Sequence, residues 1–140
     1  MIIMAIDLGK VRTGLAICDK SEMLASPLCV IEEKDDLKLI EKIGVIVAEK
    51  KPELIVVGLP KNMDSSEGES AIRCKELGEK ISLKTDVCVI MRDERLTTVS
   101  AHSFLNNTNT RGKKRKAVVD SVAATIILQD YMDYRRLHKD

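Results

Sequence analysis

The feature that most constrains the fold is an uninterrupted apolar run, LIVVG, at residues 54–58. A run without polar side chains, rich in β-branched residues, is typical of a strand that is buried on both faces. A segment of helical period precedes it at 35–51, and a capping box formed by Ser66 and Glu69 opens a second predicted helix that ends near Leu83. A strand enclosed by helices in this way predicts a parallel sheet with right-handed crossovers.

The first part of the chain predicts three short strands, at 2–7, 15–19 and 28–32. The segment LGKVRT at 8–13 joins the first two strands as a hairpin, and SEMLASP at 21–27 has the composition of a turn. Three strands joined by short turns therefore precede the alternating part of the chain.

After the capping-box helix, DVCVIMR at 86–92 predicts another buried strand. A short helix is expected at 97–106, a polar loop at 106–116 and a last helix at 118–136. The expected fold is α/β, with a mixed five-stranded sheet flanked by helices, and a single domain that covers residues 1–140.

Acidic residues stand where the predicted strands end. Asp7 ends the first strand, and Asp93 and Glu94 end the last one. Functional groups collect at the carboxyl ends of parallel strands. If the first and last strands are adjacent and parallel, about 4.8 Å apart, their carboxylates come within reach of one another. A third acid, Asp120, lies in the apolar stretch of the last helix, where a carboxylate is costly unless something satisfies it.

Each acid also has a structural explanation. Asp7 could cap the turn with its own side chain, Glu94 could pair with Arg92 or Arg95, and Asp120 could be a first-turn acid favoured by the helix dipole. Taken together, the three acids favour a carboxylate cluster, which needs a cation. Oxygen ligands suit magnesium or manganese, and a pair of such ions is a known solution for phosphodiester hydrolysis.

Two cations, Lys10 and Arg12, lie just past Asp7 and point to the same rim of the sheet. We expect them to contact a phosphate. Gly9 and Gly14 are expected to let the backbone turn tightly there.

A second group of cations, RGKKRK, occupies residues 111–116, although the net charge of the chain is only +1. Such a run is either a solvated basic loop or a local footprint for a phosphate backbone. With one Phe, two Tyr and no Trp, the chain has few stacking platforms, so nucleic acid would be gripped by phosphates and shape.

The composition also indicates the cellular compartment in which the protein is expected. The four cysteines form no C-x-x-C pair and are expected to be reduced, mostly buried thiols of a cytoplasmic protein. The apolar runs fall short of the roughly 18 residues needed to span a membrane, and no signal peptide is expected at the N-terminus. No membrane partner is therefore predicted.

Four motifs occur in order: AIDLGKVRTGLAI, VVGLPKNMDSSEG, DERLTT and KAVVDSVAATIILQDY. Together they resemble the YqgF family, also called RuvX, whose members are described as Holliday junction resolvases and as pre-16S rRNA nucleases. The resemblance covers nearly the whole chain and implies a ribonuclease H-like fold.

Matched motif by motif, the resemblance implies that Asp7, Glu94 and Asp120 are the catalytic residues and hold two magnesium or manganese ions. It also implies phosphate contacts for three cations, in addition to the contact expected for Lys10. These are Arg12, Arg95 and Lys116.

One departure from the family pattern is visible. Ser65 stands where the family usually has glycine after G-L-P-x-N-M-D, so the loop at 59–68 can differ in conformation. The loop could be a plain strand–helix connection, or Lys61 or Asn62 could contact substrate.

The implied function is a metal-dependent nuclease that processes the 5′ end of precursor 16S ribosomal RNA. The alternative is a resolvase of four-way DNA, which would act as a symmetric dimer, so both a monomer and a homodimer stay open. Two further alternatives are a non-catalytic nucleic-acid-binding module and a phosphate-binding module, because DLGKVRTG also resembles the phosphate loop of actin and sugar-kinase ATPases.

Overall fold

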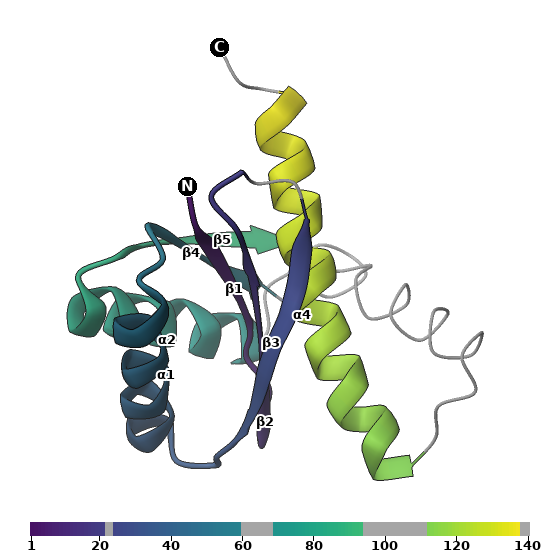
Figure 1. The fold of residues 1–140 in the computed structure, drawn as a ribbon. Coiled ribbons are helices and arrows are strands. Elements are labelled where there is room, and N and C mark those ends of the chain that lie inside the picture. The colour runs from purple at the N-terminus through teal and green to yellow at the C-terminus, as the bar shows by residue number, and fades with distance from the viewer. Residues whose placement is uncertain (22–23, 60–68, 94–111, 138–140) are drawn as a thin grey trace.

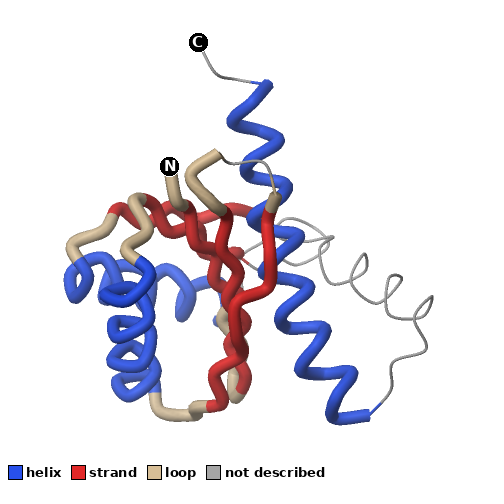
Figure 2. Tube along the Cα trace, viewed as in Figure 1, coloured by secondary structure: helices blue, strands red, loops and turns tan. Residues whose placement is uncertain are grey.

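One mixed sheet organises the chain, with α1 and α2 on one face and α4 on the other (Figures 1 and 2). The computed structural model describes residues 1–21, 24–59, 69–93 and 112–137. The elements in chain order are β1 (Ile3–Asp7), β2 (Arg12–Cys18), β3 (Ala25–Glu32), α1 (Asp36–Lys50), β4 (Leu54–Leu59), α2 (Glu69–Thr85), β5 (Cys88–Asp93) and α4 (Gly112–Leu137).

The strand order is β3-β2-β1-β4-β5. β2 is antiparallel to both β1 and β3, whereas β1, β4 and β5 are parallel. The predicted mixed five-stranded sheet is confirmed. The adjacency of the first and last strands is not, because β4 lies between β1 and β5. The carboxyl ends of β1 and β5 are therefore two strand spacings apart, on the order of 10 Å.

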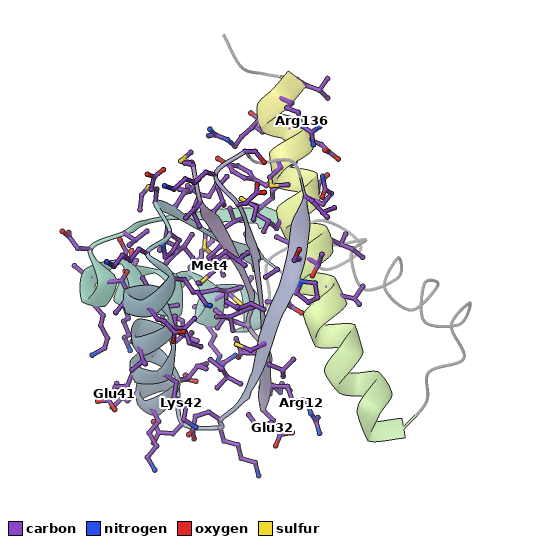
Figure 3. The ribbon with its side chains drawn as sticks, viewed as in Figure 1. Met4, Arg12, Glu32, Glu41, Lys42 and Arg136 are labelled. Carbon is purple, nitrogen blue, oxygen red and sulfur yellow. The ribbon has the colours of Figure 1, made fainter. Side chains whose placement is uncertain are left out.

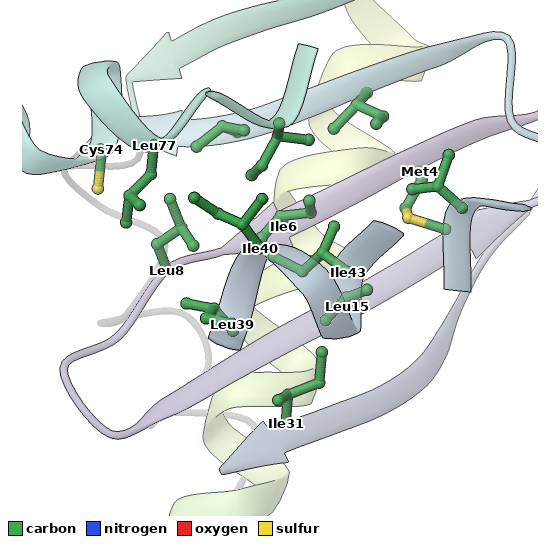
Figure 4. Close-up of a cluster of buried hydrophobic side chains, with 14 of the residues drawn as sticks. Met4, Ile6, Leu8, Leu15, Ile31, Leu39, Ile40, Ile43, Cys74 and Leu77 are labelled. Atoms are coloured by element: carbon green, nitrogen blue, oxygen red, sulfur yellow. The ribbon is translucent and has the colours of Figure 1, made fainter. Parts of the chain in front are cut away.

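Alternation along β1 divides the core into two layers. Met4 and Ile6 pack with α1 and α2 (Figure 4), while Ile3 and Ala5 pack with α4. The run at β4 is buried along its whole length, as its β-branched composition predicts, because both faces of this interior strand are covered by helices.

The helix predicted at 35–51 is confirmed as α1. Asp35 caps it, since its Oδ1 accepts hydrogen bonds from the backbone N–H groups of Leu37 (2.9 Å) and Lys38 (3.2 Å). The helix ends where Lys51 adopts a left-handed backbone conformation. The predicted capping-box residue Ser66 and the short helix expected at 97–106 lie outside the described residues.

Three local expectations are wrong. The strand at 86–92 is only partly buried, because β5 is an edge strand, and Cys88 is exposed. The turn expected at 21–27 ends earlier, since residues from Ala25 onward pair with β2. The basic segment 112–116 is the start of α4 rather than a loop, which suits the high helix propensity of Lys and Arg.

The four cysteines all lie among the described residues, and none of them forms a disulfide there. Cys18 and Cys74 are buried and Cys29 is half-buried, so the expectation of mostly buried thiols fails only at Cys88. In the part of the chain that the structure describes, none of the helices has the length and apolar character that crossing a membrane requires.

Candidate metal and nucleic-acid site

Asp7 is the last residue of β1, the central strand of the sheet, and its side chain is half-buried. Side chains alternate along a strand, so Asp7 belongs to the same face as Ile3 and Ala5, which pack with α4. The predicted carboxylate at the carboxyl end of a strand is therefore present, and it lies on the α4 side of the sheet.

The helix that covers this face carries Asp120. Ala124, one turn after Asp120, packs in the same layer as Ala5 of β1, and the structure describes Asp120 itself only by its backbone, as part of α4. The alternative of a first-turn acid is wrong, because α4 begins at Gly112, eight positions earlier, and its first turn contains no acid.

The other predicted contributors fall outside the described side chains. Glu94 and Arg95 follow the end of β5 and lie outside the described residues, as does the loop with Lys61, Asn62 and Ser65. The backbone of Lys116 lies in the second turn of α4, and its side chain is outside the described part. Among the described side chains, no group of three or more His, Cys, Asp or Glu residues is placed to hold a metal ion. Of the expected ligand set, the structure thus describes the carboxylate of Asp7 alone.

The turn after Asp7 carries the expected cations. Lys10 is exposed, and Arg12 begins β2, where its Nε lies 3.3 Å from Oε1 of Glu32 on the neighbouring strand (Figure 3). A Cβ at Gly9 would lie 2.0 Å from the carbonyl oxygen of Arg12, so the tight turn requires glycine there, as predicted. Gly14 has a different role, since it lies within β2, paired with Asp7.

A residue that the sequence did not single out holds this turn. Arg73 of α2 donates from Nη1 to the carbonyl oxygen of Gly9 at 3.0 Å. Its Nη2 donates to Oδ1 of Asp36 at 2.8 Å and its Nε to Oδ2 at 3.4 Å. No local pattern announces such a contact, because the three elements involved meet only through tertiary packing.

Glu33, just after β3, supports the turn from another side. Its backbone N–H donates to the carbonyl oxygen of Val11 at 2.8 Å. Hydrogen bonds from Lys42 and from the backbone of Asp35 hold the pKa of the Glu33 carboxyl below its usual range, so this group stays ionised at neutral pH.

The edge strand is fastened to α4 through Arg92, which was considered above as a surface partner of Glu94. Nε of Arg92 donates to Oδ2 of Asp130 at 2.8 Å, and its guanidinium lies over the ring of Tyr134, 4.8 Å from the centroid. The rings of Tyr131 and Tyr134 stack with centroids 6.3 Å apart. The two tyrosines of the chain are thus engaged with each other and with this arginine.

The sheet order, with helices on both faces and a carboxylate ending the central strand, defines a ribonuclease H-like fold. Thermus thermophilus RuvC, solved in complex with a Holliday junction substrate, aligns with a TM-score of 0.65 at 12% identity, over 99% of this chain and 97% of that one. The fowlpox virus resolvase, solved with Holliday junction DNA, aligns with a TM-score of 0.56 at 12% identity, over 99% and 100%. At such identities the likeness concerns the fold alone.

The family model of RuvX, described as "Holliday junction resolvase", matches residues 1–134, and the chain belongs to this family. A relative from Halothermothrix orenii is 41% identical over 139 residues, 99% of both chains. Another from Agathobacter rectalis is 39% identical over 137 residues, 96% of both chains. Both relatives carry the name "Putative pre-16S rRNA nuclease".

Proposed function

We propose that this chain is a metal-dependent nuclease that hydrolyses phosphodiester bonds at the 5′ end of precursor 16S ribosomal RNA. The observation that carries the proposal is the carboxylate of Asp7, delivered by the central strand to the face that α4 covers, in a member of the RuvX family. The names of relatives about 40% identical over nearly the full chain support ribosomal RNA as the substrate.

In this proposal Asp7, Glu94 and Asp120 hold one or two magnesium or manganese ions. The described part of the site fits such an ion: Asp7 supplies a hard oxygen ligand at a half-buried position, and the ion would offset the cost of burying its charge. When bound, the ions would activate the attacking water and stabilise the leaving oxygen.

The chain's own cations would bind and orient the substrate. Lys10 lies in the turn after Asp7, and Arg12 follows that turn as the first residue of β2, so a phosphate held by them would lie near the carboxylate. Arg95 and Lys116 are proposed as further phosphate contacts. Binding of this kind is electrostatic and should weaken steeply as the salt concentration rises.

We further propose that the chain acts as a single domain in the cytoplasm, with nucleic acid as its partner. Resolution of four-way DNA is the second candidate, favoured by the family description and by the likeness to RuvC in fold. A resolvase makes paired cuts, so this candidate requires a homodimer with two correctly spaced sites, whereas RNA trimming is compatible with a monomer.

One cleavage experiment tests the proposal. End-labelled precursor 16S RNA and a labelled four-way DNA junction are incubated with the protein and Mn²⁺ or Mg²⁺, and Mn²⁺ binding is measured separately by titration calorimetry. The variants are Asp7→Asn and a matched control, Asp133→Asn, in the exposed ion pair with Arg136 on α4.

We expect cleavage of the RNA, lost by at least about 100-fold in Asp7→Asn together with Mn²⁺ affinity, because metal stabilisation of the transition state contributes several kcal/mol. Asp133→Asn should cleave like the wild type. Paired symmetric cuts in the junction would favour the resolvase. Full cleavage by Asp7→Asn, with unchanged Mn²⁺ affinity, would contradict the ligand assignment.

A further inference from the structure

Three elements that are distant in the sequence meet at the guanidinium of Arg73. One end of this group donates to the Gly9 carbonyl in the β1–β2 turn, and the other grips the carboxylate of Asp36 in the first turn of α1. The Arg73 side chain is 27% exposed and that of Asp36 42% exposed, so both groups are partly withdrawn from solvent. A charge-assisted pair of this bidentate type fixes orientation as well as distance.

The contact lies behind the candidate site rather than in it. Asp7 belongs to the α4 face of the sheet, whereas Leu8, the next residue, packs in the layer with α1 and α2. Arg73 approaches the turn from the α1 and α2 side. It can therefore control where the turn sits without touching a metal or a substrate on the opposite face.

The turn spans the residues between the end of β1 and the start of β2. Within the described part of the chain, one backbone hydrogen bond outside the strand ladders reaches it, from Glu33 N–H to the carbonyl oxygen of Val11. It also carries glycine at its tightest point, which raises the entropy lost when the turn is ordered. A second anchor at the Gly9 carbonyl therefore restrains the segment that connects Asp7 to Arg12.

We propose that Arg73, clamped by Asp36, is a positioning residue for the candidate site: it fixes the β1–β2 turn and thereby the placement of Asp7 and Arg12. The inference rests on the proposed function for its consequence in catalysis, but the ordering of the turn is a property of the protein alone. Asp36 is a suitable clamp because an acid in the first turn of a helix is itself favoured by the helix dipole.

Arginine is required for this arrangement. Its planar fork can donate to the Gly9 carbonyl and to both carboxylate oxygens of Asp36 at once. Lysine offers one compact ammonium on a flexible stem, which can satisfy one partner well but not hold both in fixed geometry. Arg73→Lys should therefore keep part of the positioning effect, and Arg73→Met should lose it.

The ordering of the turn is tested by hydrogen–deuterium exchange on the protein without metal. The variants are Arg73→Met, Arg73→Lys and a matched control, Arg136→Met, which breaks an arginine–aspartate pair of the same 2.8 Å length. Arg136 lies near the C-terminal end of α4, away from Arg12 and the β1–β2 turn (Figure 3). Exchange of the amides at 8–12 should rise about tenfold in Arg73→Met and less in Arg73→Lys. Arg136→Met should leave it unchanged.

The catalytic consequence is tested by kinetics at temperatures where urea titration shows each variant to be fully folded. Arg73→Met should lower kcat about tenfold and raise the half-saturating Mn²⁺ concentration, with Arg73→Lys in between. Asp36→Asn should cause a smaller loss, and Arg73→Met combined with Asp36→Asn should be no worse than Arg73→Met alone, since both act through one contact.

The outcomes separate the two proposals. A wild type that neither cleaves RNA nor binds Mn²⁺ overturns the proposed function, while the exchange experiment still decides whether Arg73 orders the turn. An active wild type whose Arg73→Met variant shows unchanged exchange, kcat and Mn²⁺ dependence overturns the positioning role. A loss of activity in Arg73→Met that merely follows its unfolded fraction also overturns it.

Discussion

Removing the hydroxyl group of Thr13 should make the protein more stable. The residue is fully buried, and its Oγ1 has no hydrogen-bond partner among the described residues. Thr13 is paired in register with Ile31 of β3 and shares its strand face with Leu15, so the hydroxyl lies in the apolar layer that α1 covers. A buried hydroxyl without a partner costs about 1–3 kcal/mol.

Thr13→Val replaces the hydroxyl by a methyl group of similar size and keeps the β-branched shape that a strand favours. We expect the free energy of unfolding to rise by about 1–2 kcal/mol, because the desolvation cost disappears and a methyl group is buried. For a chain of this length the melting temperature should rise by roughly 3–8 °C. Urea and thermal unfolding measure both quantities.

The matched control is Thr85→Val. The hydroxyl of Thr85 donates to the carbonyl oxygen of Ile81 at 2.7 Å and accepts from the N–H of Val87 at 3.3 Å, so the same substitution breaks hydrogen bonds there. This variant should lose about 0.5–1.5 kcal/mol. Opposite signs for one chemical change would isolate hydrogen-bond satisfaction as the cause.

Cleavage activity should survive Thr13→Val, although Thr13 lies between Arg12 and Gly14 in the opening motif, because its side chain faces away from Asp7. A Thr13→Val protein that is less stable than the wild type would refute the reasoning about the unpaired hydroxyl. If the Thr13→Val protein were more stable but had lost activity, the side chain of Thr13 would not lie on the face opposite Asp7.

Two further predictions concern the turn and the thiols. Gly9→Ala should destabilise the protein by about 1–3 kcal/mol and lower its activity, because the new Cβ would lie 2.0 Å from the carbonyl oxygen of Arg12. Urea unfolding and cleavage assays measure the two effects. A variant as stable and active as the wild type would contradict the turn geometry. With iodoacetamide at neutral pH, Cys88 should be alkylated first because it is exposed, and Cys29 should react slowly because burial raises the pKa of its thiol. Cys74 is buried and should react only when the protein unfolds. Mass spectrometry of partly labelled protein measures this order, and early alkylation of Cys74 would contradict it.

Much of the element order could be predicted because it depends on local patterns. The continuous apolar run of β4 and the helical period of α1 each describe one element and its own burial. Asp7 could be assigned to a strand end for the same reason. Such patterns are short-range, and they do not depend on which strand becomes a neighbour.

The placement of neighbours could not be predicted in this way. β5 has an apolar sequence typical of a buried strand, yet it lies at the edge of the sheet, because β4 pairs with β1 and leaves β5 outside. The same strand order separates the ends of β1 and β5. The basic run at 112–116 likewise follows a polar stretch typical of a loop, but the structure places it at the start of α4.

The sequence by itself determined the succession of strands and helices, the acid at the end of β1 and the glycine that the following turn needs, because each follows from local periodicity or backbone sterics. Only the tertiary structure decided that Arg73 holds that turn with Asp36, that Thr13 faces the opposite layer from Asp7, and that α4 covers the face that Asp7 shares. The physical reason is that these contacts join segments far apart in the chain, and their geometry is set by strand pairing and helix packing rather than by neighbouring residues.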